Sequence, residues 1–186
     1  MADFIADTYR KATGADVALA NGGSIRADAT MAPGVLTKRD VLSMLPFNNR
    51  VVKIQISGAV LRSALEWGVA SIGDEAQPGR FPQVSGIRYS YDASRKPGAR
   101  LVSVTVNGKP LDDKQTYTLA TTSYVAEDAG DGYTMFKGAM QLIPKAQQPF
   151  ESDILQKAIQ SVPAIAPVLE GRITRVDSAK NQNSCN

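Results

Sequence analysis

Two short segments carry residue types that could bind a small charged molecule. The first is the run Asn21-Gly22-Gly23-Ser24-Ile25-Arg26, which follows an apolar stretch over 16–20. Adjacent glycines let backbone N–H groups approach a bound group closely, because no Cβ stands in the way. Asn21 offers an amide that both donates and accepts hydrogen bonds, and Arg26 offers a planar, permanently charged guanidinium. Glycine pairs also form plain turns, so this segment alone does not define a binding site.

The second segment is Gly130-Asp131-Gly132-Tyr133, far downstream in the chain. An ionised carboxylate accepts two hydrogen bonds at once, and flanking glycines permit close approach, so Asp131 suits a sugar diol. An aspartate in a tight turn is the plain alternative. Phe47 follows Pro46 at an expected helix end, where its ring could be held out from the core or could close the helix terminus.

The composition limits the chemistry that the chain could perform. The 186 residues suit one globular domain, with 43% hydrophobic and 21% charged residues. The chain has no histidine, which removes a Ser-His-Asp or Cys-His arrangement and the imidazole ligands that metal-dependent phosphoester hydrolysis normally uses. The only cysteine is Cys185, so no internal disulfide can form. The sequence predicts binding groups without evident catalytic machinery, and no cofactor or metal in this chain.

Charge and hydropathy exclude further classes of partner. The net charge of +3 is small and dispersed, so no nucleic-acid partner is expected. No apolar run approaches the roughly 20 residues of a membrane span. Residues 1–10 include Asp3 and Asp7 and lack the apolar core of a secretory signal.

Helices and strands that could position these groups alternate without a repeat. Thr37 is expected to cap one helix and Ser57 another, and Asn107-Gly108 predicts a hairpin turn. The mixture of hairpins and helix crossovers predicts an α+β fold, a single domain with a mixed β-sheet over 1–177, followed by a disordered polar tail at 178–186. Residues 73–79 are expected to form a mobile loop. Helices are predicted over 3–12, 38–44, 58–69 and 151–162, and strands over 17–20, 51–56, 87–91, 101–106, 117–121 and 172–176.

Four motifs in order resemble one protein family. They are Asn21-Gly22-Gly23-Ser24-Ile25-Arg26, Leu45-Pro46-Phe47, the run over 79–86 and Ala129-Gly130-Asp131-Gly132-Tyr133. Together they resemble the C-terminal domain of the 5′-nucleotidases, from about residue 4 to residue 176. The resemblance implies a nucleoside or nucleotide ligand and an N-terminal metallophosphoesterase domain of the same parent chain, which would hold two divalent metal ions. It also implies a periplasmic or cell-surface location.

The resemblance assigns a role to each candidate residue. Phe47 and Tyr124 would stack on the two faces of the base, and Asp131 would bind the ribose diol. Arg26 would contact phosphate or the nucleoside, and Asn21 would bond to the base edge or the ribose, next to Gly22 and Gly23. The chain departs from the family pattern because Ala129 replaces a glycine and the interval from Tyr124 to Asp131 is one residue longer. The predicted substrate-binding residues are therefore Asn21, Gly22, Gly23, Arg26, Phe47, Tyr124 and Asp131.

Three functions fit parts of the sequence to different extents. The resemblance implies the substrate-specificity domain of a bacterial 5′-nucleotidase-type hydrolase, which by itself would bind nucleoside and hydrolyse nothing. A dinucleotide-dependent enzyme is disfavoured, because no G-x-G-x-x-G opens a helix and no acidic residue follows at the required interval. A non-catalytic interaction module derived from the same domain is the other alternative, and the altered loop Ala129-Gly130-Asp131-Gly132 is its support in the sequence.

Overall fold

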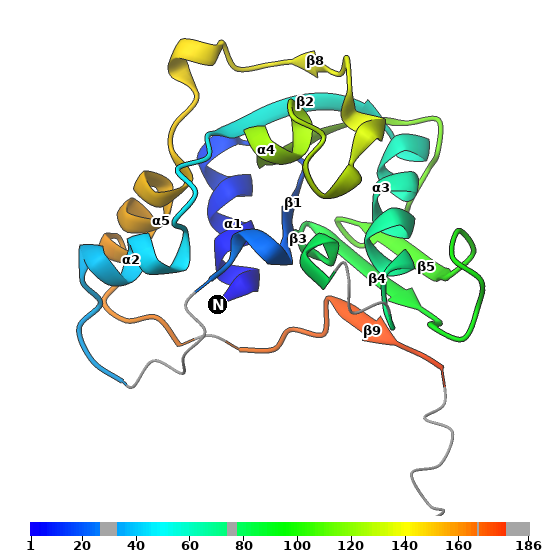
Figure 1. Ribbon diagram of the computed structural model, residues 1–186, viewed down its shortest axis with the longest axis horizontal. Helices are drawn as coiled ribbons and strands as arrows, with labels where there is room; N and C mark the ends of the chain where they lie inside the picture. Colours follow the sequence, from blue (N-terminus) through cyan, green and yellow to red (C-terminus); the bar gives the residue numbers. More distant parts are fainter. Residues whose placement is uncertain (27–32, 74–77, 167, 178–186) are drawn as a thin grey trace, which may run out of the picture.

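Two mixed β-sheets and their covering helices make up the fold in a computed structural model that describes residues 1–26, 33–73, 78–166 and 168–177 (Figure 1). The predicted tail at 178–186 and most of the predicted mobile loop at 73–79 lie outside these residues. The helices are α1 (Ala2–Thr13), α2 (Lys38–Met44), α3 (Gly58–Ala70), α4 (Ser123–Ala126) and α5 (Glu151–Gln160). The strands are β1 (Val17–Asn21), β2 (Val51–Ser57), β3 (Pro82–Ser85), β4 (Ile87–Tyr91), β5 (Leu101–Val106), β6 (Lys109–Pro110), β7 (Thr116–Thr122), β8 (Met140–Gln141) and β9 (Ile173–Arg175).

The larger sheet has the strand order β3-β1-β7-β2-β8. Strands β1 and β7 run parallel, whereas β3 is antiparallel to β1, and β2 is antiparallel to both β7 and β8. The smaller sheet has the order β6-β5-β4-β9, with β9 parallel to β4. The α+β class with mixed sheet and hairpins is confirmed, with two sheets where the sequence analysis expected one.

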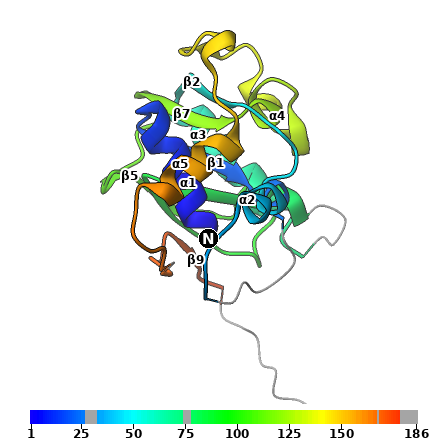
Figure 2. The same ribbon diagram turned by 90° about the vertical axis from the view of Figure 1, so that its left-hand side faces the viewer.

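Two apolar cores cover the two faces of the larger sheet. Alternate residues of a strand face opposite sides, and in β1 Val17 and Leu19 belong to one core while Ala18 and Ala20 belong to the other. The first core lies against α3 and the smaller sheet; we call it the α3 core. The second lies against α1, α2 and α5; we call it the α1 core. Small side chains on that face let α1 approach closely, and α1 and α5 lie side by side over it (Figure 2).

Local signals in the sequence account for several element boundaries. Thr37 accepts a hydrogen bond from the Asp40 N–H, while the Asp40 carboxylate accepts one from the Thr37 N–H, which completes a capping box at the start of α2. The Ser57 hydroxyl oxygen accepts the Val60 N–H at the start of α3. Asn107 and Gly108 both have positive φ, as the tight β5–β6 hairpin requires. The last helix ends at Gln160, two residues earlier than predicted.

Candidate functional site

Four strand ends meet at one edge of the larger sheet. Because β1 and β7 are parallel, with Ala18 opposite Ala120, their carboxyl ends lie at the same edge. Strand β2 begins there, because Val51 pairs antiparallel with Thr122. Strand β3 also begins there, since Asn21 pairs with Pro82. Loops from distant parts of the sequence therefore gather at this edge, including those that carry the predicted site residues.

Three of the predicted residues are joined by hydrogen bonds at this edge. The Asn21 Nδ2 donates to Oδ2 of Asp131 at 2.6 Å, and the Tyr124 hydroxyl donates to Oδ1 of Asp131 at 3.1 Å. The Ser24 hydroxyl donates to Oδ1 of Asn21 at 2.5 Å, which orients the amide so that its nitrogen faces Asp131. We call Asn21, Ser24, Tyr124 and Asp131 the Asp131 cluster. Each carboxylate oxygen has more than one lone pair, so both can accept a further hydrogen bond.

The backbone around Asp131 adopts an uncommon conformation that aims the carboxylate. Ala129 has φ 53° and ψ 35°, and Asp131 has φ 52°, both in the left-handed region. Ala129 thus adopts the left-handed conformation without being a glycine. Gly130 is buried, and a Cβ on it would lie 2.3 Å from Cε1 and Cζ of the Tyr124 ring. The glycine at 130 is therefore what allows the ring to lie against this loop.

Trp67 of α3 supports the same loop from the α3 core, and the sequence analysis did not give it this role. Its indole Nε1 donates to the Asp131 carbonyl oxygen at 2.9 Å. The Arg80 guanidinium lies 4.2 Å from the Trp67 ring centroid, and the Tyr133 hydroxyl donates to the Arg80 carbonyl oxygen at 2.6 Å. The feature of the sequence that could have indicated this role is the indole N–H of Trp67, since a largely covered indole requires a hydrogen-bond acceptor.

Gly22 and Gly23 serve close packing between two loops. They begin a 3-10 helix over Gly22–Ser24 directly after β1. The Gly22 N–H donates to the Phe81 carbonyl oxygen at 2.8 Å, so this donor is already paired. A Cβ on Gly23 would lie 2.9 Å from the Cα of Gly79, which leaves no room for a side chain. The two glycines thus bring the loop after β1 against the segment before β3.

Phe47 and Arg26 form a second group, separate from the Asp131 cluster. Phe47 is 50% exposed, so its ring is held out from the core, and the Arg26 guanidinium carbon lies 5.3 Å from the ring centroid. The Arg26 N–H donates to the Met44 carbonyl oxygen at 2.8 Å, which ties the two segments together. The loop that carries Phe47 continues into Arg50, whose carbonyl oxygen accepts the Ser123 N–H at 2.8 Å, next to Tyr124.

The protonation state of Tyr124 suits its contact with Asp131. Burial raises the pKa of the Tyr124 phenol above its ordinary value of 10.0; the hydrogen bond from the Asp131 N–H opposes this rise, and the charge of Asp131 adds to it. The hydroxyl therefore stays protonated near neutral pH and remains a donor to the carboxylate. Tyr124 is 36% exposed, so part of its ring faces solvent.

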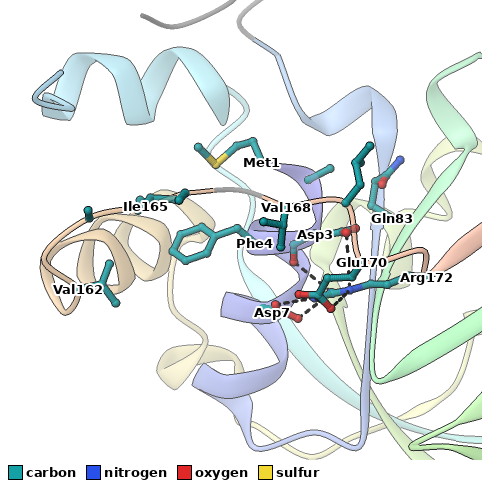
Figure 3. Close-up of a pocket in the computed structure, with 14 residues that line it drawn as sticks. Met1, Asp3, Phe4, Asp7, Gln83, Val162, Ile165, Val168, Glu170 and Arg172 are labelled. Carbon is teal, nitrogen blue, oxygen red and sulfur yellow. Dashed lines mark hydrogen bonds and ion pairs between the residues drawn. The ribbon is translucent and has the colours of Figure 1, made fainter. Parts of the chain in front are cut away.

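A cavity of about 480 Å³ lies elsewhere, beneath the first turns of α1 (Figure 3). Figure 3 shows the side chains of Asp3, Asp7 and Glu170 turned toward Arg172, which pairs with Asp7 at 2.8 Å and Glu170 at 3.0 Å. Burial raises the pKa of Asp7, but hydrogen bonds from Arg172 and Ser85 outweigh it and hold that pKa below 3.8. None of the predicted site residues lines this cavity, and its charged groups join α1 to the segment before β9.

Metal ligands and membrane spans were sought in the part of the chain that the structure describes. Those residues contain no group of three or more His, Cys, Asp or Glu side chains placed to hold a metal ion. A pair of divalent ions therefore has no fitting ligand set among them. No helix among them is both long and apolar enough to cross a bilayer.

Comparisons with known proteins match this chain in sequence and in fold. The family model described as "5'-nucleotidase, C-terminal domain" matches residues 1–138. Protein 5NUC of Lutzomyia longipalpis is 35% identical over 172 residues, 87% of this chain and 30% of that protein. The snake venom 5'-nucleotidase of Macrovipera lebetinus is 34% identical over 169 residues, 86% of this chain and 40% of that protein. The crystal structure of a 5'-nucleotidase precursor from Thermus thermophilus superposes with a TM-score of 0.84 at 32% identity, covering 95% of this chain and 35% of that one.

Proposed function

Because this chain belongs to the 5′-nucleotidase C-terminal domain family, we propose that its sheet edge binds the nucleoside part of a nucleotide substrate. The observation that carries the proposal is the Asp131 carboxylate, which Asn21 and Tyr124 hold at the carboxyl ends of two parallel strands. Its unused lone pairs suit the two hydroxyls of a ribose. Ligands of open α/β sheets commonly bind at this edge.

We assign the other predicted residues in the same way. Phe47 and Tyr124 each expose part of a ring and would stack on a base, which contributes about 1–3 kcal/mol per base. Arg26, beside Phe47, would pair with a phosphate group. Asn21 is only 1% exposed, so its proposed role is to hold Asp131 and not to contact the base edge directly.

We propose that phosphoester hydrolysis belongs to a separate N-terminal metallophosphoesterase domain of the parent chain. The chain spans 30% and 40% of the two curated relatives described above, so most of each relative lies outside the match. Two divalent metal ions in that domain would supply a hydroxide nucleophile and stabilise charge on the phosphate. This chain alone is expected to bind nucleoside without hydrolysing nucleotides. We also propose a periplasmic or cell-surface location, because one relative is a venom protein and venom proteins are secreted.

The test is a titration of the chain with adenosine, followed by amide chemical shifts in NMR spectra. We expect shifts at 21–26, at Phe47 and at 124–131. Asp131→Ala removes the carboxylate that would accept the diol, and hydrogen bonds to charged groups contribute about 1.5–3 kcal/mol, so affinity should fall roughly 10- to 100-fold. Asp128→Ala, an exposed carboxylate in the same loop, is the matched control and should bind normally.

Two results would contradict the proposal. The first is the absence of shifts up to the solubility limit of adenosine, which would favour the interaction module derived from the same domain. The second is equal affinity of the Asp131→Ala and Asp128→Ala variants. Metal-dependent phosphatase activity of a clean preparation of this chain would contradict only the assignment of catalysis to another domain.

A further inference from the structure

A fully buried carboxylate lies outside the Asp131 cluster and has no assigned role. Glu151, the first residue of α5, is 0% exposed. Its Oε2 accepts the Tyr9 hydroxyl at 2.7 Å, and its Oε1 accepts both the Asn49 N–H at 3.3 Å and the Asn49 Nδ2 at 3.1 Å. The Glu151 N–H in turn donates to the Asn49 carbonyl oxygen at 3.0 Å. Asn49 is therefore fixed through its N–H, its carbonyl and its side chain by this one residue.

The carboxylate makes no ion pair with another described residue. Arg50, which directly follows Asn49 in the chain, instead lies with its guanidinium carbon 4.4 Å from the Phe150 ring centroid and donates to the Gln148 carbonyl oxygen at 2.8 Å. Burial accordingly raises the pKa of Glu151 above its ordinary value, although the bonds from Tyr9 and Asn49 oppose this. A buried carboxylate without a cation stabilises a fold poorly, and an apolar side chain of similar size often serves better.

Asn49, the residue that Glu151 holds, lies two positions after Phe47 in the chain. The intervening Asn48 has φ 56°, so the loop between α2 and β2 turns sharply there. The Phe47 ring is half exposed, and the Arg26 side chain described against it is itself exposed. The position of the ring is therefore set by the backbone of its loop, and Asn49 is where that backbone is anchored to α5.

We infer that Glu151 is a positioning residue that, through Asn49, holds the Phe47 loop in the place required for stacking on a base. Glu151 does not touch the ligand. The inference rests on the proposed function, since it concerns the same nucleoside site. It adds a part of the chain beyond residue 138, where the match to the family model ends, to the residues on which binding depends.

The experiment compares adenosine affinity in variants that share one background. Tyr9→Phe removes the hydroxyl that donates to Glu151 but leaves the Asn49 contacts, so its adenosine affinity should match that of the unmodified chain. Tyr9→Phe/Glu151→Leu also removes the carboxylate and replaces it with an apolar group of similar size, which keeps the site filled. We expect a roughly tenfold or greater loss of affinity in the double variant, equivalent to about 1.4 kcal/mol or more.

Two further measurements separate positioning from general destabilisation. Glu151→Gln retains an acceptor for Asn49, so its adenosine affinity should lie within about threefold of that of the unmodified chain. NMR relaxation of the Phe47 and Asn49 amides without ligand should show added motion in the double variant only, while the α5 amides stay ordered. Equal affinity in Tyr9→Phe and Tyr9→Phe/Glu151→Leu, or unchanged loop motion, would overturn the inference. If the unmodified chain fails to bind adenosine, the proposed function itself is what fails.

Discussion

Gly130→Ala is the substitution whose effect on the candidate site is most directly given by distances. A Cβ at this position would lie 2.3 Å from Cε1 and Cζ of Tyr124. Carbon atoms in contact are ordinarily about 3.5–4.0 Å apart, so the ring must retreat by more than about 1 Å. Gly130 does not have a positive φ, so alanine adds no left-handed backbone strain there. The expected effect of the substitution is therefore a steric clash that displaces the Tyr124 ring.

The retreat of the ring separates its hydroxyl from Asp131. That hydroxyl donates to the Asp131 carboxylate at 3.1 Å and accepts the Asp131 N–H at 3.2 Å, and a shift of about 1 Å takes both beyond hydrogen-bonding distance. Two such bonds contribute about 1–3 kcal/mol to the free energy of unfolding. If Tyr124 stacks on the base, the loss of stacking weakens binding by a further 1–3 kcal/mol, or about a 5- to 150-fold loss of adenosine affinity.

Urea unfolding and adenosine titration together measure these two effects. Gly34→Ala is the matched control, because a Cβ there meets no atom within 4 Å and the φ of Gly34 is not positive. Its free energy of unfolding and its adenosine affinity should both be unchanged. In a Tyr124→Ala background the clash is absent, so adding Gly130→Ala should cost nothing further. Unchanged stability and affinity in Gly130→Ala, or additive losses with Tyr124→Ala, would refute the reasoning.

Three other substitutions probe the same loop and the α1 ion pairs. Ala129→Gly relieves a left-handed conformation that costs an alanine about 1–2 kcal/mol but widens the unfolded ensemble, so urea unfolding should show a net gain of about 0.5–1 kcal/mol. Trp67→Phe removes the N–H donated to the Asp131 carbonyl oxygen and should lower the free energy of unfolding by about 1 kcal/mol, with added motion of the neighbouring amides in NMR relaxation. Burial raises the pKa of Asp7, but the hydrogen bond from Arg172 contributes to a net pKa below 3.8; the stability that Asp7 contributes is thus present above pH 3.8 and lost below it. Asp7→Asn should therefore destabilise the chain in urea unfolding at neutral pH, and the difference should shrink as the pH falls below 3.8.

Local chemistry made part of the fold predictable from the sequence. The capping box of Thr37, the cap of Ser57 and the Asn107-Gly108 turn each depend on residues within a few positions, so their outcome could be inferred without the fold. The strand β3 was missed, because it has only four residues and begins at Pro82, a residue type that is uncommon within strands. Its existence depends on pairing with β1, which a local pattern does not report.

The candidate site was predictable in its residue types but not in its contacts. Asn21 and Asp131 each had the functional groups of a binding residue, yet their hydrogen bond joins positions 110 residues apart. Trp67 and Glu151 were missed because they act through other residues: one holds the Asp131 backbone, and the other holds Asn49. The indole N–H of Trp67 indicates that an acceptor is needed but not which one, and nothing in the sequence around Glu151 indicates its contact with Asn49.

The two halves of the candidate site are held from opposite faces of the larger sheet. The Asp131 cluster is supported by Trp67, which packs against the α3 core, while the Phe47 loop is supported by Glu151 and Tyr9, on the side of the α1 core. Because no described hydrogen bond joins the two supports, Trp67→Phe and Tyr9→Phe/Glu151→Leu should change the free energy of unfolding additively, within about 0.5 kcal/mol. Their effects on adenosine affinity should not be additive if one ligand must contact both halves at once. Double-mutant cycles on unfolding and on affinity test this, and a large coupling in the ligand-free unfolding data would show that the two supports are a single unit.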